Sequence, residues 1–205
     1  MTDSGPARTA PCRTRSTTLD HTPGSTLRRR DHVYQVVVRV LAVMLLPAAL
    51  LVAPRRSRLV ACRWALSARF PAECLAGLAP AARAAFEAAR TEALWRDGEL
   101  IGLTSGHRDA REQTRLFAEA VRRTGSPELA RRWVLPPEES RHVSGTAMDV
   151  RPTEGARWLE RHGRRYGLYR VYENEWWHFE YHPEAIDDGC PPRYADPTHG
   201  PRMRR

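Results

Sequence analysis

Three short segments hold most of the side chains that could do chemistry. They are SGHRDAREQ at residues 105–113, SRHVSGTAMD at 140–149 and ENEWWHFEY at 173–181. His142, Asp149 and His178 lie in the last two segments, and two imidazoles with one carboxylate form a three-ligand set for a catalytic zinc ion with an open fourth position. Taken singly, His142 fits an ordinary surface-loop histidine and His178 a hydrogen-bonded core histidine. The residues alone leave both interpretations open.

Glu175 and Arg108 could supply other parts of a hydrolytic site. A carboxylate beside a metal can take a proton from water and deliver it to a leaving amine. Glu175 precedes His178 by three residues, so in an extended segment the two side chains point to opposite faces and meet only if the chain bends. Arg108 follows a Ser-Gly pair at the predicted end of a strand, from which a guanidinium can bind a carboxylate or an oxyanion. The alternatives are a solvated acid and a surface arginine.

The hydrophobic pattern predicts the elements that position these residues. Helices are predicted at 78–96, from Asp109 to about Arg123, at 126–134 and at 153–167, with Asp109, Ser126 and Thr153 as N-caps. Strands are predicted within 98–106, at 147–152, and at 168–172 and 175–182, the last two as an antiparallel pair. The chain from Asp187 is expected to be irregular. The fold class is therefore α+β, with a small, mainly antiparallel sheet flanked by helices.

Composition bounds the domain count and argues against nucleic-acid binding. At 205 residues the chain can form one compact domain with a tail, and its 41% hydrophobic and 28% charged residues are typical of a soluble globular protein. The net charge of +9 is uneven, since residues 1–60 carry +7 and residues 61–205 only +2. All 33 basic residues are arginine, which indicates codon bias. We expect no nucleic-acid partner; a basic binder would act through residues 1–60 and be sensitive to salt.

The N-terminal region has the pattern of a targeting sequence. Residues 1–32 are polar and basic, and we expect them to be disordered. Residues 33–53 are apolar except for interruptions such as Arg39 and Pro47, which suits a cleaved export signal or a retained membrane anchor. The structural alternative is a buried helix of the domain. Residues 54–61 are predicted to be a linker, followed by the domain at 62–205.

The four cysteines are candidates for disulfides in an exported protein. They are Cys12, Cys62, Cys74 and Cys190, with no C-x-x-C spacing typical of metal binding. Cys12 precedes the apolar segment and could not join an exported framework. We favour Cys74 with Cys190, with Cys62–Cys74 as the alternative.

The three segments, in this order, resemble the VanY-type D-alanyl-D-alanine carboxypeptidases, which are zinc enzymes related to the VanX-type dipeptidases. The family pattern is SG-aromatic-R with a Gln five residues after the Arg, then SxHxxGxAxD, then E-x-W-H. Its counterparts here are SGHR with Gln113, the complete SRHVSGTAMD, and EWWH at 175–178, within a similarity from about Cys74 to PPRYADPTHGPRM. Two positions depart from the pattern: His107 replaces Tyr or Trp, and Trp176 stands where carboxypeptidases often carry Pro, which puts the preferred peptide length in doubt.

The resemblance implies a role for each matching residue. His142, Asp149 and His178 would hold Zn²⁺, Glu175 would be the general base and Arg108 would contact the substrate. Gln113 and Ser140 would support the site or bind substrate.

The implied function is that of a monomeric, extracytoplasmic carboxypeptidase, secreted or anchored through residues 33–53. Its substrates would be peptidoglycan stem peptides ending in D-Ala-D-Ala. The alternatives are a D-Ala-D-Ala dipeptidase, a peptidoglycan endopeptidase, and a zinc-stabilised peptidoglycan-binding module without turnover.

Overall fold

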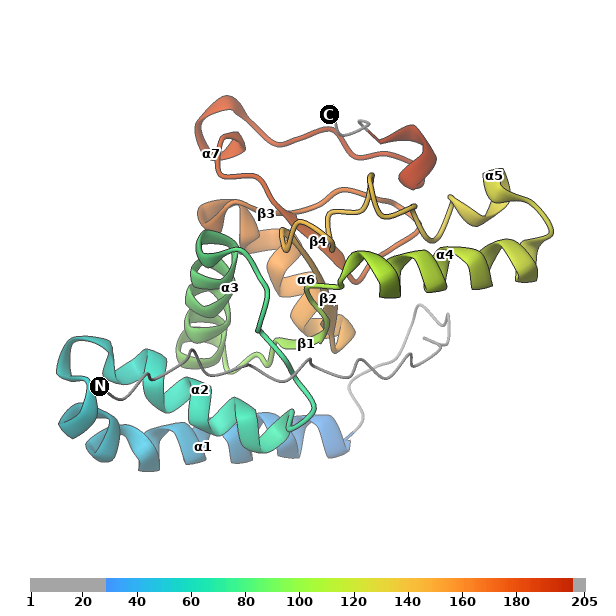
Figure 1. Ribbon diagram of the computed structural model, residues 1–205. Helices are drawn as coiled ribbons and strands as arrows, with labels where there is room; N and C mark the ends of the chain where they lie inside the picture. The colour runs from blue at the N-terminus through green and yellow to red at the C-terminus, as the bar shows by residue number, and fades with distance from the viewer. Residues whose placement is uncertain (1–28, 201–205) are drawn as a thin grey trace, which may run out of the picture.

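The computed structural model describes residues 29–200 and contains one four-stranded sheet (Figure 1). The strands are β1 (Gly102–Ser105), β2 (Ala147–Arg151), β3 (Leu168–Arg170) and β4 (His178–Tyr181), in the order β1-β2-β4-β3. Every neighbouring pair in this sheet is antiparallel. The predicted α+β class and the antiparallel sheet are confirmed.

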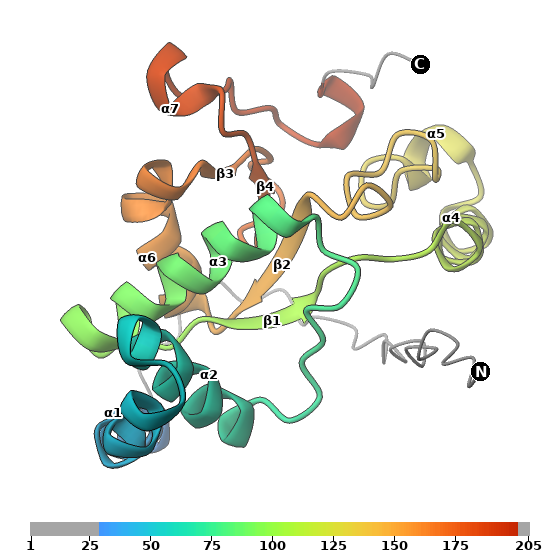
Figure 2. The same cartoon turned by 60° about the vertical axis from the view of Figure 1, so that its left-hand side comes forward.

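Two helices, α3 (Pro80–Glu92) and α6 (Thr153–His162), cover one face of the sheet (Figures 1 and 2). The main core lies between them and the sheet, and includes Phe86, Met148, Val150, Trp158 and Phe179. Successive side chains of a strand point to opposite faces. Met148 and Val150 of β2 face the core, so Asp149 between them points to the other face of the sheet. Phe179 of β4 also faces the core, so the residues on either side of it point to that other face as well.

The remaining helical elements lie around this core. Residues Ala93–Asp97 form a π-helical turn after α3, and 3-10 turns span Pro54–Arg56, Gly163–Tyr166 and Pro197–His199. The other helices are α1 (Arg29–Val52), α2 (Ser57–Arg69), α4 (Ala110–Thr124), α5 (Pro127–Ala130) and α7 (Ala185–Asp188). Helices α1 and α2 pack side by side below the sheet, and α4 and α5 extend from the end of β1 (Figure 1).

The local signals in the sequence located most element ends. Asp109 caps α4 by accepting a hydrogen bond from the Glu112 amide, and Ser126 caps α5 in the same way through Leu129. The predicted cap Thr153 is wrong, because α6 has Pro152 at its N-cap and no side-chain cap. The predicted strand at 175–182 begins only at His178, because Glu175–Trp177 form a turn.

Two helices begin inside N-terminal segments that we expect to be disordered or to form a linker. Helix α1 begins at Arg29, inside the region expected to be disordered, and α2 begins at Ser57, inside the predicted linker at 54–61. Residues 1–28 lie outside the described part of the chain. A second apolar cluster joins α1 and α2 to the domain, with Cys62, Leu66, Phe70, Leu94 and Leu100 among its buried members.

The favoured disulfide is wrong. Cys190 is exposed and free, Cys62 is buried and free, and Cys74 is disulfide-bonded. Neither Cys74–Cys190 nor Cys62–Cys74 is therefore formed, and Cys12 lies outside the described residues.

Candidate functional site

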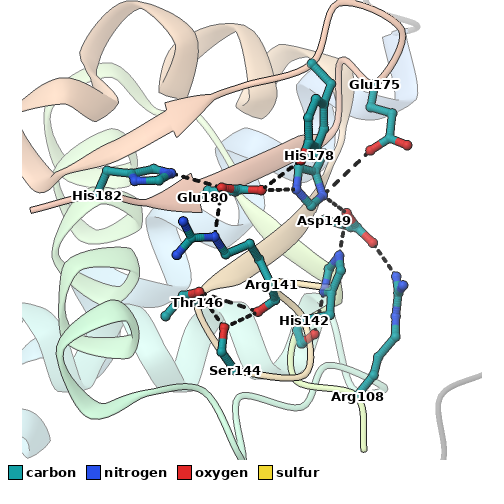
Figure 3. Close-up of polar contacts among 12 residues, drawn as sticks. Arg108, Arg141, His142, Ser144, Thr146, Asp149, Glu175, His178, Glu180 and His182 are labelled. Carbon is teal, nitrogen blue, oxygen red and sulfur yellow. Dashed lines mark hydrogen bonds and ion pairs between the residues drawn. The ribbon is translucent and has the colours of Figure 1, made fainter. Parts of the chain in front are cut away.

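The strand register brings the candidate ligands together on the face of the sheet opposite α3 and α6. In the β2–β4 ladder Asp149 lies directly across from His178. The Asp149 Oδ1 atom is 3.0 Å from His178 Nδ1 and 3.3 Å from His142 Nε2. The ligand atoms of these three buried residues all lie within 4.8 Å of one another (Figure 3). The structure thus places side by side the three residues that the sequence singled out.

A tight loop before β2 holds His142 in place. The His142 carbonyl accepts hydrogen bonds from the amides of Arg108 and Gly145, at 3.1 Å each. Gly145 has φ of +70°, and an added Cβ would lie 2.5 Å from the Gly77 carbonyl oxygen, so the loop requires glycine there. The Gly145 carbonyl accepts a hydrogen bond from the Ala79 amide at 3.0 Å. The loop is therefore attached to the start of α3.

Hydrogen bonds to their other nitrogens orient both histidine rings. His142 Nδ1 lies 2.7 Å from the Gly106 carbonyl oxygen, which can only accept, so this nitrogen carries the proton and Nε2 keeps its lone pair toward Asp149. His178 Nε2 lies 3.3 Å from Glu180 Oε1, which leaves Nδ1 facing Asp149. The two nitrogens that face Asp149 and the Asp149 carboxylate converge from three sides. This donor set fits a zinc ion with three protein ligands.

Charge around the cluster also favours a bound cation. Burial alone would raise the pKa of Asp149, but His142, His178 and Arg108 hold it well below its ordinary value. Burial opposes protonation of His178, yet its hydrogen bonds to Asp149 and Glu180 raise its pKa to about 10. The surrounding carboxylates therefore stabilise positive charge at this position.

Glu175 lies beside the cluster because the chain turns where a strand was predicted. The turn at 175–177 is closed by a hydrogen bond from the His178 amide to the Glu175 carbonyl, at 3.3 Å. As a result Glu175 Oε2 lies 3.7 Å from His178 Nδ1, three positions further along the chain. Burial raises the pKa of Glu175 to about 8. The bend required by the sequence analysis is present.

Arg108 reaches the cluster from the loop after β1. Its Nε donates to Ser105 Oγ at 2.8 Å, its Nη2 to Asp149 Oδ2 at 2.6 Å and its Nη1 to Gln113 Oε1 at 3.5 Å. Gln113 is buried and also donates to the Leu135 carbonyl at 2.7 Å. A guanidinium has five N–H groups, so two remain for a ligand.

A cleft of about 250 Å³ opens onto these residues. Ser140, Arg108 and Gln113 line it together with the cluster, and Trp133, Leu135 and Trp177 add apolar surface. The two positions that depart from the family pattern do not line the cleft. His107 lies against Gly77, and Trp176 packs on the main core.

The sequence analysis missed the residues behind His178. Glu180 is buried, and its Oε2 lies 2.9 Å from His182 Nε2 and 3.5 Å from Arg141 Nε (Figure 3). The Tyr172 hydroxyl donates to Glu180 Oε1 at 3.4 Å, and the Tyr172 ring stacks on His178. A signal was present, because His178, Glu180 and His182 occupy alternate positions of a predicted strand and so share one face.

Comparison with known proteins points to one family. The model described as VanY, D-alanyl-D-alanine carboxypeptidase, matches residues 76–184, just over half of the chain. No curated protein matches the sequence.

Several solved structures are similar. A D,D-pentapeptidase VanY mutant from a VanB-type vancomycin resistance cassette, in complex with Zn(II), is 24% identical, with 54% of this chain and 76% of that chain covered and a TM-score of 0.48. VanYB in complex with D-alanine-D-alanine is 22% identical, with 55% and 78% covered and a TM-score of 0.49. DacB from Streptococcus pneumoniae D39 is 26% identical, with 55% and 71% covered and a TM-score of 0.45.

The family match includes all three segments that form the cluster and the cleft, at 105–113, 140–149 and 173–181. The chain accordingly belongs to the VanY D-alanyl-D-alanine carboxypeptidase family.

Proposed function

We propose that this protein is a zinc-dependent D,D-carboxypeptidase that removes the terminal D-Ala from peptidoglycan stem peptides. The observation that carries the proposal is the convergence of His142 Nε2, Asp149 Oδ1 and His178 Nδ1 at the base of a cleft, with Glu175 beside them. Membership of the VanY family supports the substrate class. Because the enzyme would act on the cell wall, its place is extracytoplasmic.

His142, Asp149 and His178 would hold the zinc ion. When bound, zinc supplies Lewis-acid polarisation of a carbonyl and a lower pKa for water. Glu175 has no direct hydrogen bond to Asp149 or His142 among the contacts described, so its carboxylate, when ionised, is available to act on protons in the cleft. It would take a proton from the attacking water and pass it to the nitrogen of the leaving D-Ala.

Arg108 would contact the substrate near the scissile bond. Ser105, Asp149 and Gln113 hold its guanidinium, so little side-chain entropy is lost when it binds. The two remaining N–H groups of Nη1 and Nη2 can donate to a peptide carboxylate or to a developing oxyanion. Gln113 and Ser140 support this side of the cleft.

Glu180 would position His178 and would not itself contact substrate. Its Oε1 holds His178 Nε2, while His182 and Arg141 hold the other oxygen. Such partners fix the tautomer of a ligand histidine and its ring orientation.

The test is release of free D-Ala from a stem pentapeptide ending in D-Ala-D-Ala, using the full chain with zinc, with chelator, and with zinc restored. Zinc-dependent release of one D-Ala is expected. Release of D-Ala-D-Ala as a dipeptide or a cut within the stem would indicate an endopeptidase, and cleavage of free D-Ala-D-Ala alone a dipeptidase. No cleavage of any of these substrates by the zinc-loaded, folded chain would indicate a binding module.

A further inference from the structure

Helix α1 has two faces of different character. Gln35, Val38, Ala42, Leu45 and Ala49 follow one another at intervals of three and four residues and form a single stripe. Val38, Ala42 and Ala49 are buried, and Leu45 is partly buried. This inner face packs along α2.

Polar contacts also attach the inner side of α1 to the domain. Gln35 Nε2 donates to Glu99 Oε2 at 2.9 Å, and Arg39 Nη2 donates to the Trp95 carbonyl at 3.1 Å. The charged residue that interrupts the apolar segment is thus bound to the folded domain.

Removal of α1 would uncover part of the core. Val38 and Ala42 complete the cluster that buries Leu66, Leu94 and Leu100. If α1 left the domain to cross a bilayer, these side chains would meet water, and Arg39 would enter the hydrocarbon, where a charged side chain is strongly disfavoured. The docked position therefore competes directly with a spanning one.

The outer face of α1 is apolar and exposed. Nine large apolar side chains on this helix are each at least 47% exposed: Val33, Val36, Val37, Val40, Val43, Met44, Leu50, Leu51 and Val52. Most of them lie on the stripe opposite the inner face, and no charged residue occurs between Arg39 and Arg55. Monomeric soluble proteins rarely expose so continuous an apolar patch.

A basic region adjoins the C-terminal end of this face. Arg55, Arg56 and Arg58 are exposed in the turn after α1 and at the start of α2. They line a shallow hollow with Trp95 and Arg96, in which Glu92 is the single carboxylate among the lining residues. Glu92 is itself paired with Arg96 and Arg165. The hollow therefore presents positive charge beside apolar surface.

We propose that α1 stays docked on the domain and binds in the plane of an anionic lipid bilayer, with its outer face in the interface and Arg55, Arg56 and Arg58 at the headgroups. An apolar helical face with a basic margin is the pattern of an interfacial helix. The basic charge favours anionic lipid over a second copy, because a copy would bring the same positive charge to the contact. The described lining of the catalytic cleft includes no residue of α1 or α2, so docking leaves the cleft open. In Figure 1 α1 lies at the bottom, and β2 and β4, which hold Asp149 and His178, lie above it.

The first experiment measures flotation of the full chain with phosphatidylcholine vesicles, with and without phosphatidylglycerol. Binding that requires the anionic lipid is expected. The variant Met44→Glu/Leu51→Glu should weaken binding by about tenfold or more, because both side chains leave the interface. Its matched control is Leu129→Glu/Ile186→Glu, which changes exposed apolar residues of α5 and α7 and should bind like the parent. Arg55→Gln/Arg56→Gln should remove the preference for anionic lipid. Thermal unfolding verifies that each variant is folded.

The second experiment separates in-plane binding from spanning. A fluorophore is attached at Val36→Cys, Met44→Cys or Leu51→Cys in a Cys190→Ser background, which removes the exposed free cysteine of the described region. Quenching by lipids labelled at different depths should give one shallow depth at all three positions. A graded profile that is deepest at position 44 would overturn the proposal in favour of a spanning helix. The proposal would also be overturned if the folded protein did not bind vesicles, or if it formed a dimer through this face.

Discussion

At the residue scale, the two rings of the cluster use opposite nitrogens. His142 directs Nε2 and His178 directs Nδ1 toward Asp149, because Gly106 and Glu180 hold the other nitrogen of each ring. One partner is a backbone carbonyl and the other a carboxylate on the same strand as the histidine. The orientation of His178 should therefore be sensitive to a single side-chain substitution, whereas that of His142 depends on the loop backbone.

Glu175→Gln should retain zinc but lose turnover. The amide preserves the shape of the side chain in its turn and cannot accept the proton, so we expect kcat to fall by about 10²- to 10⁴-fold. Metal content by atomic absorption and D-Ala release measure the two effects. His142→Ala is the contrasting variant and should lose both zinc and activity. Turnover at the parent rate in Glu175→Gln would remove Glu175 from the role of base.

Glu180→Gln should weaken zinc binding by about 10- to 100-fold, because the amide no longer holds His178 Nε2 with a carboxylate. Competition with a chelator of known affinity measures the change independently of activity. Glu184→Gln is the matched control, since Glu184 contacts His182 at 3.0 Å but its side chain is 64% exposed. Equal zinc affinity in the two variants would contradict a positioning role for Glu180.

At the element scale, the loop between His142 and β2 depends on close backbone approach. Gly125 and Gly145 both have positive φ, at +77° and +70°. An added Cβ meets nothing within 4 Å at Gly125, but at Gly145 it meets the Gly77 carbonyl oxygen at 2.5 Å and the Ala79 amide nitrogen at 2.9 Å. Substituting alanine at the two positions therefore distinguishes the cost of a left-handed backbone from the cost of a steric clash.

Gly125→Ala should lower the free energy of unfolding by about 1–2 kcal/mol, the cost of left-handed backbone alone. Gly145→Ala should lower the free energy of unfolding by a further 1–3 kcal/mol, roughly the cost of overpacking, because backbone atoms must move. It should also weaken zinc binding, since the same loop holds His142. Urea unfolding and chelator competition measure both quantities. Equal losses of stability in the two variants would show that the loop accommodates the added methyl group without a steric cost.

At the scale of the whole molecule, Asp97 links the π-helical turn after α3 to α6. Its carboxylate pairs with Arg96 at 2.8 Å and accepts a hydrogen bond from Trp158 Nε1 at 2.6 Å. These hydrogen bonds, first that of Arg96 and then that of Trp158, lower the pKa of Asp97 to about 2 from an ordinary 3.8. Because the pKa is lower in the folded state, ionised Asp97 stabilises the fold at pH values above its ordinary pKa. This stabilisation is lost as the pH falls toward 2.

Asp97→Asn should therefore reduce the urea midpoint near neutral pH, where the parent carboxylate is ionised. The difference between the two proteins should shrink as pH falls from 3.8 to about 2, because the parent carboxylate then becomes neutral. Parallel urea titrations across this range measure it. A difference that does not change with pH would show that the charge of Asp97 contributes nothing to stability.

Local sequence determined much of the framework. Alternating residues such as Met148, Asp149 and Val150 separate core from site within one strand. Asp109 and Ser126 begin their helices by accepting a hydrogen bond from the backbone amide three residues later. These features depend on neighbours within a few residues, so spacing and residue type predict them. The three-residue ligand set, Glu175 and Arg108 were likewise visible as candidates.

Only the tertiary structure decided how those candidates meet. The register of β2 and β4 places Asp149 opposite His178, and the turn at 175–177 brings Glu175 to the same face. The docking of α1 also depends on partners far away in the chain, and the sequence did not predict that Cys190 stays free. Residue types and spacing specify local conformation, whereas strand register and helix docking depend on the burial of side chains that are distant in sequence.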